Sequence, residues 1–197
     1  MRKHIKLLGV LSVNKSFIPL IVCASFTVLV ISLLYRQSQT VLKERLRERL
    51  EAIASTASLQ FNPSDIEKIQ TEEDLNSDEM KRVLKIMQRV RDNNSDLRYI
   101  YIWRKTDTPN ILKFVADAEM IDPIDIDGNG KIEGEEIPPA PGEDYDISET
   151  MSVLEGFDHP FALRDFISDR WGTFLSGYAP IRDESGKAIA ILGIDEL

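Results

Sequence analysis

Twelve residues near the middle of the chain, Asp125 to Glu136 (DIDGNGKIEGEE), carry its densest set of oxygen donors. Acidic or amide side chains occupy places one, three, five, nine and twelve, namely Asp125, Asp127, Asn129, Glu133 and Glu136. A hard cation needs several oxygens, and short carboxylates alternating along a coiled backbone provide them. Gly130 at place six permits the positive-φ bend that closes such a coil. The segment therefore predicts a calcium site.

This spacing is that of a twelve-residue EF-hand loop. Lys131, at place seven, would contribute only its backbone carbonyl. Glu136 is long enough to bind through both oxygens, which suits Ca²⁺ better than Mg²⁺. The alternative is an exposed acidic turn, because Asp-Gly and Asn-Gly are turn dipeptides. A turn, however, requires neither Ile132 nor Glu136 at its place.

Prolines flank the loop, at Asp122-Pro123 before it and at Pro138-Pro139 after it. They exclude long helices on either side, so no helix pair is available to open on calcium binding. Single extracellular loops bind calcium at about 10⁻⁴ to 10⁻³ M. We therefore expect a structural calcium site that fixes the loop between residues 119 and 146.

Charge is distributed unevenly along the 197 residues. All 33 acidic residues and all but four of the 24 basic residues follow Tyr35. So acidic a region should repel nucleic acid and anionic lipid, and attract cations. Cys23 is the single cysteine, so no disulfide can form within the chain.

Residues 17–35 (FIPLIVCASFTVLVISLLY) carry no charge. At about 1.5 Å per residue they come close to the bilayer core of about 30 Å, which predicts a transmembrane signal anchor. Residues 1–16 would then be a basic cytoplasmic N-terminus, and residues 36–197 an extracytoplasmic domain. A cleaved signal peptide is the alternative, although no small-residue cleavage site follows. Basic residues also follow the span, so charge alone does not orient it.

Three helices are expected after the span. The first, residues 36–60, carries an apolar stripe that packs either on its own domain or in a parallel homodimer: Leu42, Leu46, Leu50, Ile53 and Ala57. Asn62-Pro63 begins a short helix, which ends near Ile69. Ser77 caps the third, which ends near Arg91 and has a core-type face formed by Met80, Val83, Leu84, Met87 and Val90.

Five strands are then expected. The first, Leu97 to Arg104 (LRYIYIWR), places Tyr99, Tyr101 and Trp103 on one face. The others are residues 111–118, 162–168, 173–181 and 187–195, with a short helix at 148–155 capped by Ser148. Helices followed by antiparallel strands predict an α+β fold.

The run from Trp171 to Asp195 (WGTFLSGYAPIRDESGKAIAILGID) resembles the C-terminal hairpin of extracytoplasmic Cache sensor domains, which are PAS-like. The shared pattern is an aromatic-Gly turn, Tyr-x-Pro-Ile, an Asp/Gly turn and an apolar strand ending in Gly-x-Asp. The resemblance covers about residues 36–197. It implies a five-stranded antiparallel sheet with helices on one face.

The resemblance also implies a domain that senses small ligands for a membrane-bound kinase, cyclase or chemoreceptor. Such receptors continue into a second membrane span and an output module, whereas this sequence ends at Leu197. The calcium loop, within 119–146, would be an insertion into the family's pattern.

One face of the sheet is the expected ligand pocket. Aromatic walls with a few converging polar groups are typical of such pockets. The candidates are Tyr99, Tyr101, Trp103, Asp117, Tyr178 and Asp195. The resemblance implies that Asp195 contacts ligand amines. The alternative is that these aromatic residues are simply core.

No catalytic constellation is apparent: the two histidines, His4 and His159, are far apart, and no nucleophile or zinc spacing is present. We therefore expect a membrane-anchored, calcium-binding sensor domain that is not an enzyme. A calcium-binding interaction protein without a small-molecule ligand is the alternative. A calcium-dependent enzyme is a weaker third hypothesis.

Overall fold

The computed structural model describes residues 17–120, 123, 125, 128–169 and 171–196. The chain divides into two compact units, Met1–Glu44 and Arg45–Leu197. Helix α1 (Ile18–Ser58) contributes residues to both. The expected cytoplasmic N-terminus, residues 1–16, lies outside the described residues.

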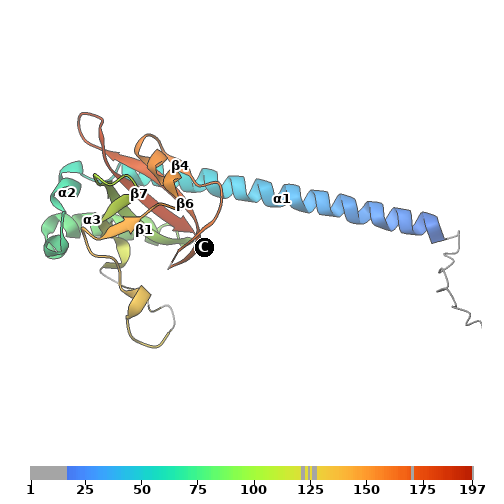
Figure 1. The fold of residues 1–197 in the computed structure, drawn as a ribbon, viewed down its shortest axis with the longest axis horizontal. Helices are drawn as coiled ribbons and strands as arrows, with labels where there is room; N and C mark the ends of the chain where they lie inside the picture. The colour runs from blue at the N-terminus through green and yellow to red at the C-terminus, as the bar shows by residue number, and fades with distance from the viewer. Residues whose placement is uncertain (1–16, 121–122, 124, 126–127, 170, 197) are drawn as a thin grey trace, which may run out of the picture. The chain divides into compact units, whose positions relative to one another are not determined.

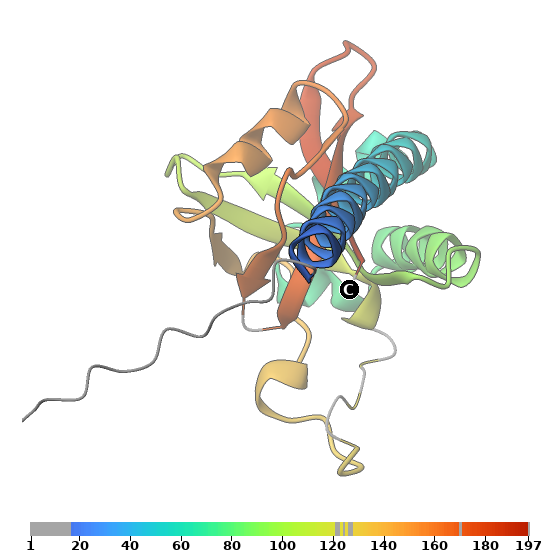
Figure 2. The ribbon, with the colours of Figure 1, turned by 90° about the vertical axis from the view of Figure 1, so that its right-hand side faces the viewer.

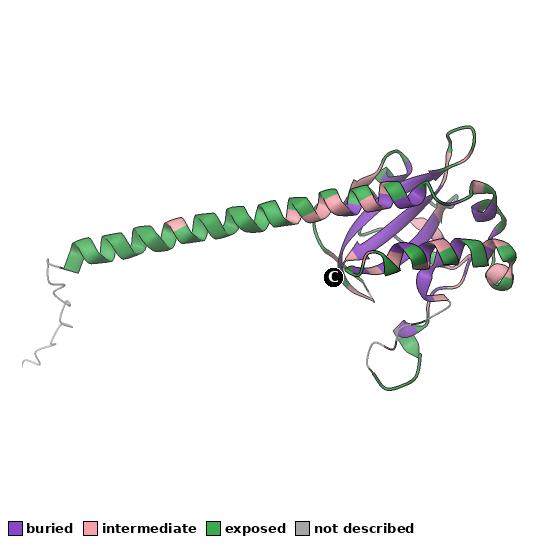
Figure 3. Ribbon diagram, turned by 180° about the vertical axis from the view of Figure 1, so that it is seen from behind, coloured by how far each residue is buried: buried purple, intermediate pink, exposed green. Residues whose placement is uncertain are grey.

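In the first unit, α1 is long and apolar enough to cross a membrane. Apolar side chains of the expected span, such as Phe26 and Leu29, are exposed, as the green ribbon of Figure 3 shows. An uncovered apolar helix of this length is what a bilayer would enclose. Leu42, the first member of the predicted stripe, is exposed as well.

The second unit is an α+β domain, as predicted. Its strands are β1 (Leu97–Lys105), β2 (Ile111–Asp117), β3 (Asp144–Asp146), β4 (Phe161–Ala162), β5 (Ile167–Asp169), β6 (Gly172–Arg182) and β7 (Ala188–Glu196). They pair antiparallel in the order β3-β2-β1-β7-β6-β4, with β5 on the start of β6. Long strands β1 and β7 occupy the centre of the sheet (Figure 1).

The sheet therefore has seven strands among the described residues, where the sequence predicts five. The expected strand 162–168 is divided into β4 and β5, because exposed Arg164 and Asp165 interrupt it. Strand β3 has only three residues and no apolar alternation; it exists through its pairing with β2.

The helix expected at 148–155 is instead the 3₁₀ helix η5 (Met151–Phe157). Its N-cap position is Thr150, without a side-chain capping bond. Ser148 does not cap η5. The backbone N–H and the hydroxyl of Ser148 both donate to Asp146 Oδ1, and these bonds stabilise the turn that precedes η5.

Helices α2 (Pro63–Lys68) and α3 (Asp78–Asp92) begin where the sequence predicts. Asn62 Oδ1 accepts from the Ser64 N–H at 3.0 Å, and Ser77 Oγ accepts from the Met80 N–H at 3.1 Å. These bonds satisfy backbone donors that have no partner within the helix. A second 3₁₀ helix, η2 (Glu72–Asn76), connects α2 to α3.

Helix α3 and the C-terminal part of α1 lie on the same face of the sheet (Figures 2 and 3). The whole predicted stripe of α3 is buried, and so are Leu50 and Ala57 of α1. Gly177 of β6 permits the close approach of α1, because an added Cβ would lie 2.9 Å from Leu50 Cβ. Since helices cover this face, a ligand site must form on the other.

Candidate functional site

The face of the sheet opposite α1 and α3 carries Tyr99, Tyr101 and Trp103 of β1, all three buried. Strand register brings carboxylates beside them: Asp117 of β2 lies opposite Tyr101, and Asp195 of β7 lies opposite Tyr99. Opposed residues of antiparallel strands share a face. Because β2 and β7 flank β1, the two carboxylates stand on either side of β1.

Tyr101 is the centre of a buried hydrogen-bond network. Its hydroxyl donates to Asp195 Oδ1 at 3.0 Å and lies 3.2 Å from the Tyr178 hydroxyl. Burial, together with the nearby Asp195 charge, raises the pKa of both phenols, so they remain protonated. Gly193 makes room for this ring, because an added Cβ would lie 2.2 Å from it.

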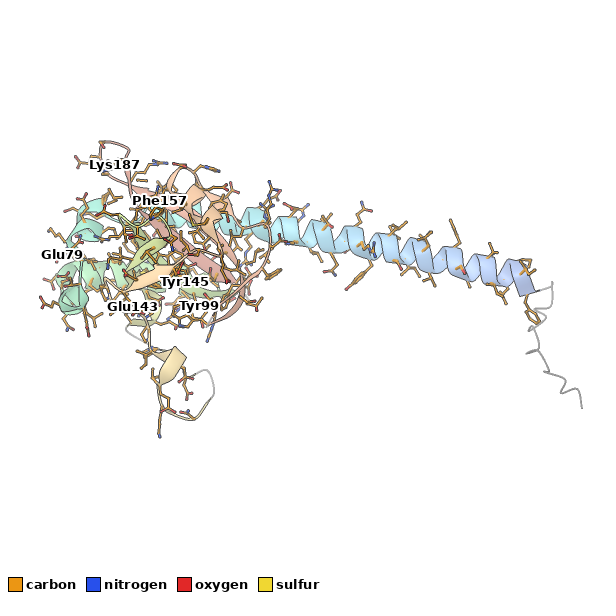
Figure 4. All side chains as sticks on the ribbon, viewed as in Figure 1. Glu79, Tyr99, Glu143, Tyr145, Phe157 and Lys187 are labelled. Carbon is orange, nitrogen blue, oxygen red and sulfur yellow. The ribbon has the colours of Figure 1, made fainter. Side chains whose placement is uncertain are left out.

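Aromatic rings from β2, β3 and the turn before β6 complete the wall. Trp103 stacks on Tyr145 of β3 with ring centroids 4.5 Å apart, and Phe114 meets Trp103 edge-on at 5.6 Å. Tyr145 also stacks on Trp171, 6.0 Å away, and its hydroxyl donates to Asp169 Oδ2 at 3.1 Å. Figure 4 labels Tyr145 among the side chains of the domain. Edge-on and offset contacts of this kind stabilise aromatic clusters.

These side chains surround a cavity of about 30 Å³, room for about two water molecules. Its lining residues are Tyr99, Tyr101, Trp103, Phe114, Asp117, Glu119, Pro139, Tyr145, Ile167, Asp169, Trp171, Phe174 and Asp195. Both tryptophans of the chain are therefore in the lining.

Three carboxyl groups of the lining are buried: Asp117, Glu119 and Asp195 are each 6% exposed. Burial raises the pKa of each to about 7. For Glu119 the neighbouring Asp117 charge adds to this increase, whereas Arg98 and Arg91 oppose it. Near neutral pH these groups are thus poised between the neutral and charged forms.

None of these three carboxylates has an ion-pair partner among the described residues, and no lysine or arginine is found among the described residues of the lining. Two buried atoms of the lining, Glu119 Oε1 and Trp103 Nε1, also have no hydrogen-bond partner in the described part of the chain. Buried polar atoms are normally satisfied, so each exception requires an explanation. The arrangement can accept a cation between aromatic faces.

Five of the six predicted ligand residues line the cavity. The exception is Tyr178, which does not line it and instead supports Tyr101, stacking on Phe161 at 5.6 Å. Sequence reasoning missed Glu119, Tyr145 and Asp169. Glu119 is placed by the 3₁₀ helix η3 (Ala118–Met120), where its N–H donates to Asp117 Oδ1 at 2.8 Å. No local sequence pattern predicts the η3 turn.

Residues of the predicted calcium loop form a compact coil. Asp125 accepts three backbone N–H groups, from Gly128 (2.8 Å), Asn129 (3.1 Å) and Gly130 (2.7 Å). Gly128 and Gly130 have φ of 74° and 80°, so both need the left-handed conformation that glycine adopts readily. Asn129 Oδ1 accepts from the Lys131 N–H at 2.8 Å.

The second half of the loop ends in the 3₁₀ helix η4 (Gly134–Glu136). Glu136 reaches back so that its Oε2 accepts from the Glu133 N–H at 3.3 Å. Asp127 lies outside the described residues, and no group of three acidic or histidine side chains close enough to hold a metal occurs among those described. Only short 3₁₀ helices, η3 and η4, adjoin the described parts of the loop.

No protein-family model and no curated protein matches this sequence. Among solved structures, the chain is similar to the ligand-binding domain of the Campylobacter jejuni chemoreceptor Tlp3, solved in complex with L-valine. The identity is 16% and the TM-score 0.46, over 86% of this chain and 62% of that one. So distant a similarity says nothing about the ligand of the present chain.

Proposed function

We propose that this chain is the ligand-binding part of a membrane-anchored, extracytoplasmic sensor, and that its ligand is a small molecule with a positively charged amine. The observation that supports this is the convergence of Asp117, Glu119 and Asp195 with aromatic rings in one cavity, without a paired cation in the described part of the chain. Burying a carboxylate without a cation is costly. An ammonium group would pair with it and lie over the rings.

Ligand entry requires one wall of the cavity to move, because about 30 Å³ is too small for an organic amine. The wall formed by Tyr145 and Trp171 is the best candidate. Both side chains are half-buried, and Tyr145 belongs to β3, which pairs with β2 through only three residues. Displacing this short edge strand would break few of the hydrogen bonds of the sheet. The movement of β3 would transmit ligand binding to the rest of a receptor.

Tryptophan fluorescence tests the amine site directly, because Trp103 and Trp171 are the only tryptophans and both line the cavity. We expect 1-aminobutane to change the emission of the full chain in detergent micelles, with saturation. Asp195→Asn should abolish the change while leaving the thermal unfolding temperature high enough to show a folded domain. Unchanged emission of the folded wild-type protein with every amine tried would exclude the amine site.

The anchored, extracytoplasmic topology is supported by the apolar part of α1. Cys23 is the only native cysteine, so replacing it with alanine and adding Glu184→Cys gives a single thiol on an exposed turn. A membrane-impermeant maleimide should label this thiol in intact cells. Labelling only after lysis would place the domain on the cytoplasmic side.

The alternative is a membrane-anchored interaction protein without small-molecule sensing. The close stacking of Trp103 on Tyr145 and on Tyr101 (4.3 Å) favours it, because rings that fill the face leave little space. A core without a ligand would not require a buried carboxylate, because an apolar residue in its place would make the domain more stable. The fluorescence titration above distinguishes the two functions.

We also propose that the loop of residues 125–136 binds calcium. Its donors are oxygens, which suit a hard cation, and its glycines already adopt the required bends. Asp125, Asp127, Asn129, Glu133 and Glu136 would hold the ion with the Lys131 carbonyl. Without long flanking helices the ion would fix the loop in place and would not open a helix pair.

A further inference from the structure

We infer that the cavity selects a diamine: an unbranched chain with an ammonium group at each end and no carboxylate. This inference rests on the proposed function, because it names the ligand class of the same cavity. It comes from two groups of carboxylates on opposite sides of β1, in a lining whose described residues include no base.

The first carboxylate group is Asp117 with Glu119, which the bond from the Glu119 N–H to Asp117 Oδ1 holds together at 2.8 Å. The second is Asp195, with Asp169 at the exposed side of the cavity. Asp117 and Asp195 lie on β2 and β7, two strand spacings apart, so their backbones are separated by about 10 Å. Side chains reaching inward from both strands bring the carboxylates closer together than their backbones. A short diamine would bridge this span once the wall of the cavity has moved.

Unsatisfied atoms indicate where the second ammonium group binds. Asp117 Oδ1 and Asp195 Oδ1 each accept a hydrogen bond from the protein, whereas Glu119 Oε1 accepts none although the residue is 94% buried. A buried acceptor of this kind requires a donor. Trp103 Nε1 is the other unsatisfied atom among the described residues of the lining, and a water molecule would accept its hydrogen bond.

Charge excludes the common alternative of an amino acid. A ligand carboxylate would enter a cavity lined by four acidic side chains, and like charges at this range repel strongly where water is scarce. The described lining offers it no arginine or lysine. Methylene groups, by contrast, would contact the apolar side chains of the lining, among them Phe114, Ile167 and Phe174.

Three ligands with the same four-carbon chain test the inference: 1,4-diaminobutane, 1-aminobutane and 4-aminobutanoate. They differ only in the second end, which is an ammonium, a methyl or a carboxylate group. Calorimetric titration of the full chain in detergent micelles should show the diamine binding at least tenfold more tightly than 1-aminobutane. The amino acid should bind most weakly.

Glu119→Gln should lower the affinity for 1,4-diaminobutane at least tenfold, to that of 1-aminobutane, and change the affinity for 1-aminobutane less than twofold. Glu184→Gln, on an exposed turn, is the matched control and should change neither. Should Glu119→Gln fail to fold, the three-ligand comparison on wild-type protein still decides the question.

Equal binding of the diamine and 1-aminobutane, or tighter binding of 4-aminobutanoate, would overturn the diamine inference and leave the amine sensor standing. Absence of binding by all three ligands would overturn both.

Discussion

The cavity and the loop of residues 125–136 are both rich in carboxylates, yet their surroundings differ. In the cavity, Asp117 and Asp195 are buried among aromatic rings and have raised pKa values. In the loop, Asp125 is satisfied by three backbone N–H groups, and residues 128–134 are exposed. Carboxylate side chains thus occur both in a buried site, from which water is largely excluded, and in a solvent-exposed loop.

Hydration decides which cation each site prefers. A dry carboxylate beside aromatic faces favours an organic ammonium, which is less strongly hydrated than a divalent metal ion and binds over rings. A loop of hydrated carboxylates and carbonyls favours a hard metal ion, which exchanges water oxygens for protein oxygens. The two regions should therefore respond to different cations, the cavity to an organic amine and the loop to calcium.

The largest effect is expected from Gly193→Ala, which fills the space of the Tyr101 ring. The added Cβ would lie 2.2 Å from a ring that Asp195 and Tyr178 hold in place. We expect the free energy of unfolding to fall by about 3 kcal/mol, with loss of amine binding. Chemical denaturation and the fluorescence titration measure both effects.

Gly186→Ala is the control for backbone strain. Gly186 has φ of 85° and open space around the position of an added Cβ. Its replacement should cost only about 1 kcal/mol and leave amine binding unchanged. Equal losses in the two variants would show that Gly193 does not act through the Tyr101 ring.

Without ligand, the stability of the protein should depend on pH through the buried carboxyl groups of the cavity. Carboxyls whose pKa is raised to about 7 bind more protons in the folded state than in the unfolded state. Their contribution to stability is complete below a pH of about 4 and is lost as the pH rises to about 7. One such group changes the free energy of unfolding by roughly 3 kcal/mol over this window.

Denaturation of the wild-type protein at pH 5 and pH 8 should therefore show lower stability at pH 8, and Asp195→Asn should reduce the difference. Asp65 acts in the opposite direction, because its bond to Arg82 lowers its pKa, but its effect is confined to lower pH. Stability that rises from pH 5 to pH 8 would contradict the assignment of buried, unpaired carboxylates.

The smallest effect is expected from calcium. Calorimetry should show one site with Kd of about 10⁻⁴ to 10⁻³ M, lost in Asp125→Ala and in Glu136→Gln. Calcium at ten times Kd would stabilise the protein by only about 1.4 kcal/mol. Lys131→Ala is the control, because only its backbone carbonyl is expected to bind; loss of binding in this variant would contradict the proposed donor set.

Sequence reasoning succeeded where the information is local. The buried stripe of α3 and its Ser77 cap follow from periodicity and hydrogen-bonding chemistry within a few residues. Alternation along β1 placed Tyr99, Tyr101 and Trp103 on one face, and all three line the cavity.

Long-range pairing explains what was missed. Strand β3 forms only because Ile111–Lys113 of β2 pair with it, and this pairing brings Tyr145 to the cavity. Glu119 depends on the η3 turn, and Tyr178, which stacks on Phe161, does not line the cavity. None of these contacts has a signature within a short window of sequence.

Hydrogen exchange on the full chain, with an amine or with calcium, tests most directly whether the two carboxylate regions are separate sites. With 1,4-diaminobutane, protection should increase in the segments of residues 97–119 and 190–196 and stay unchanged in 128–137. Calcium should protect 128–137 and leave the sheet segments unchanged. Protection of the sheet by calcium alone, with no response to the amine, would contradict the existence of a separate amine site on the sheet.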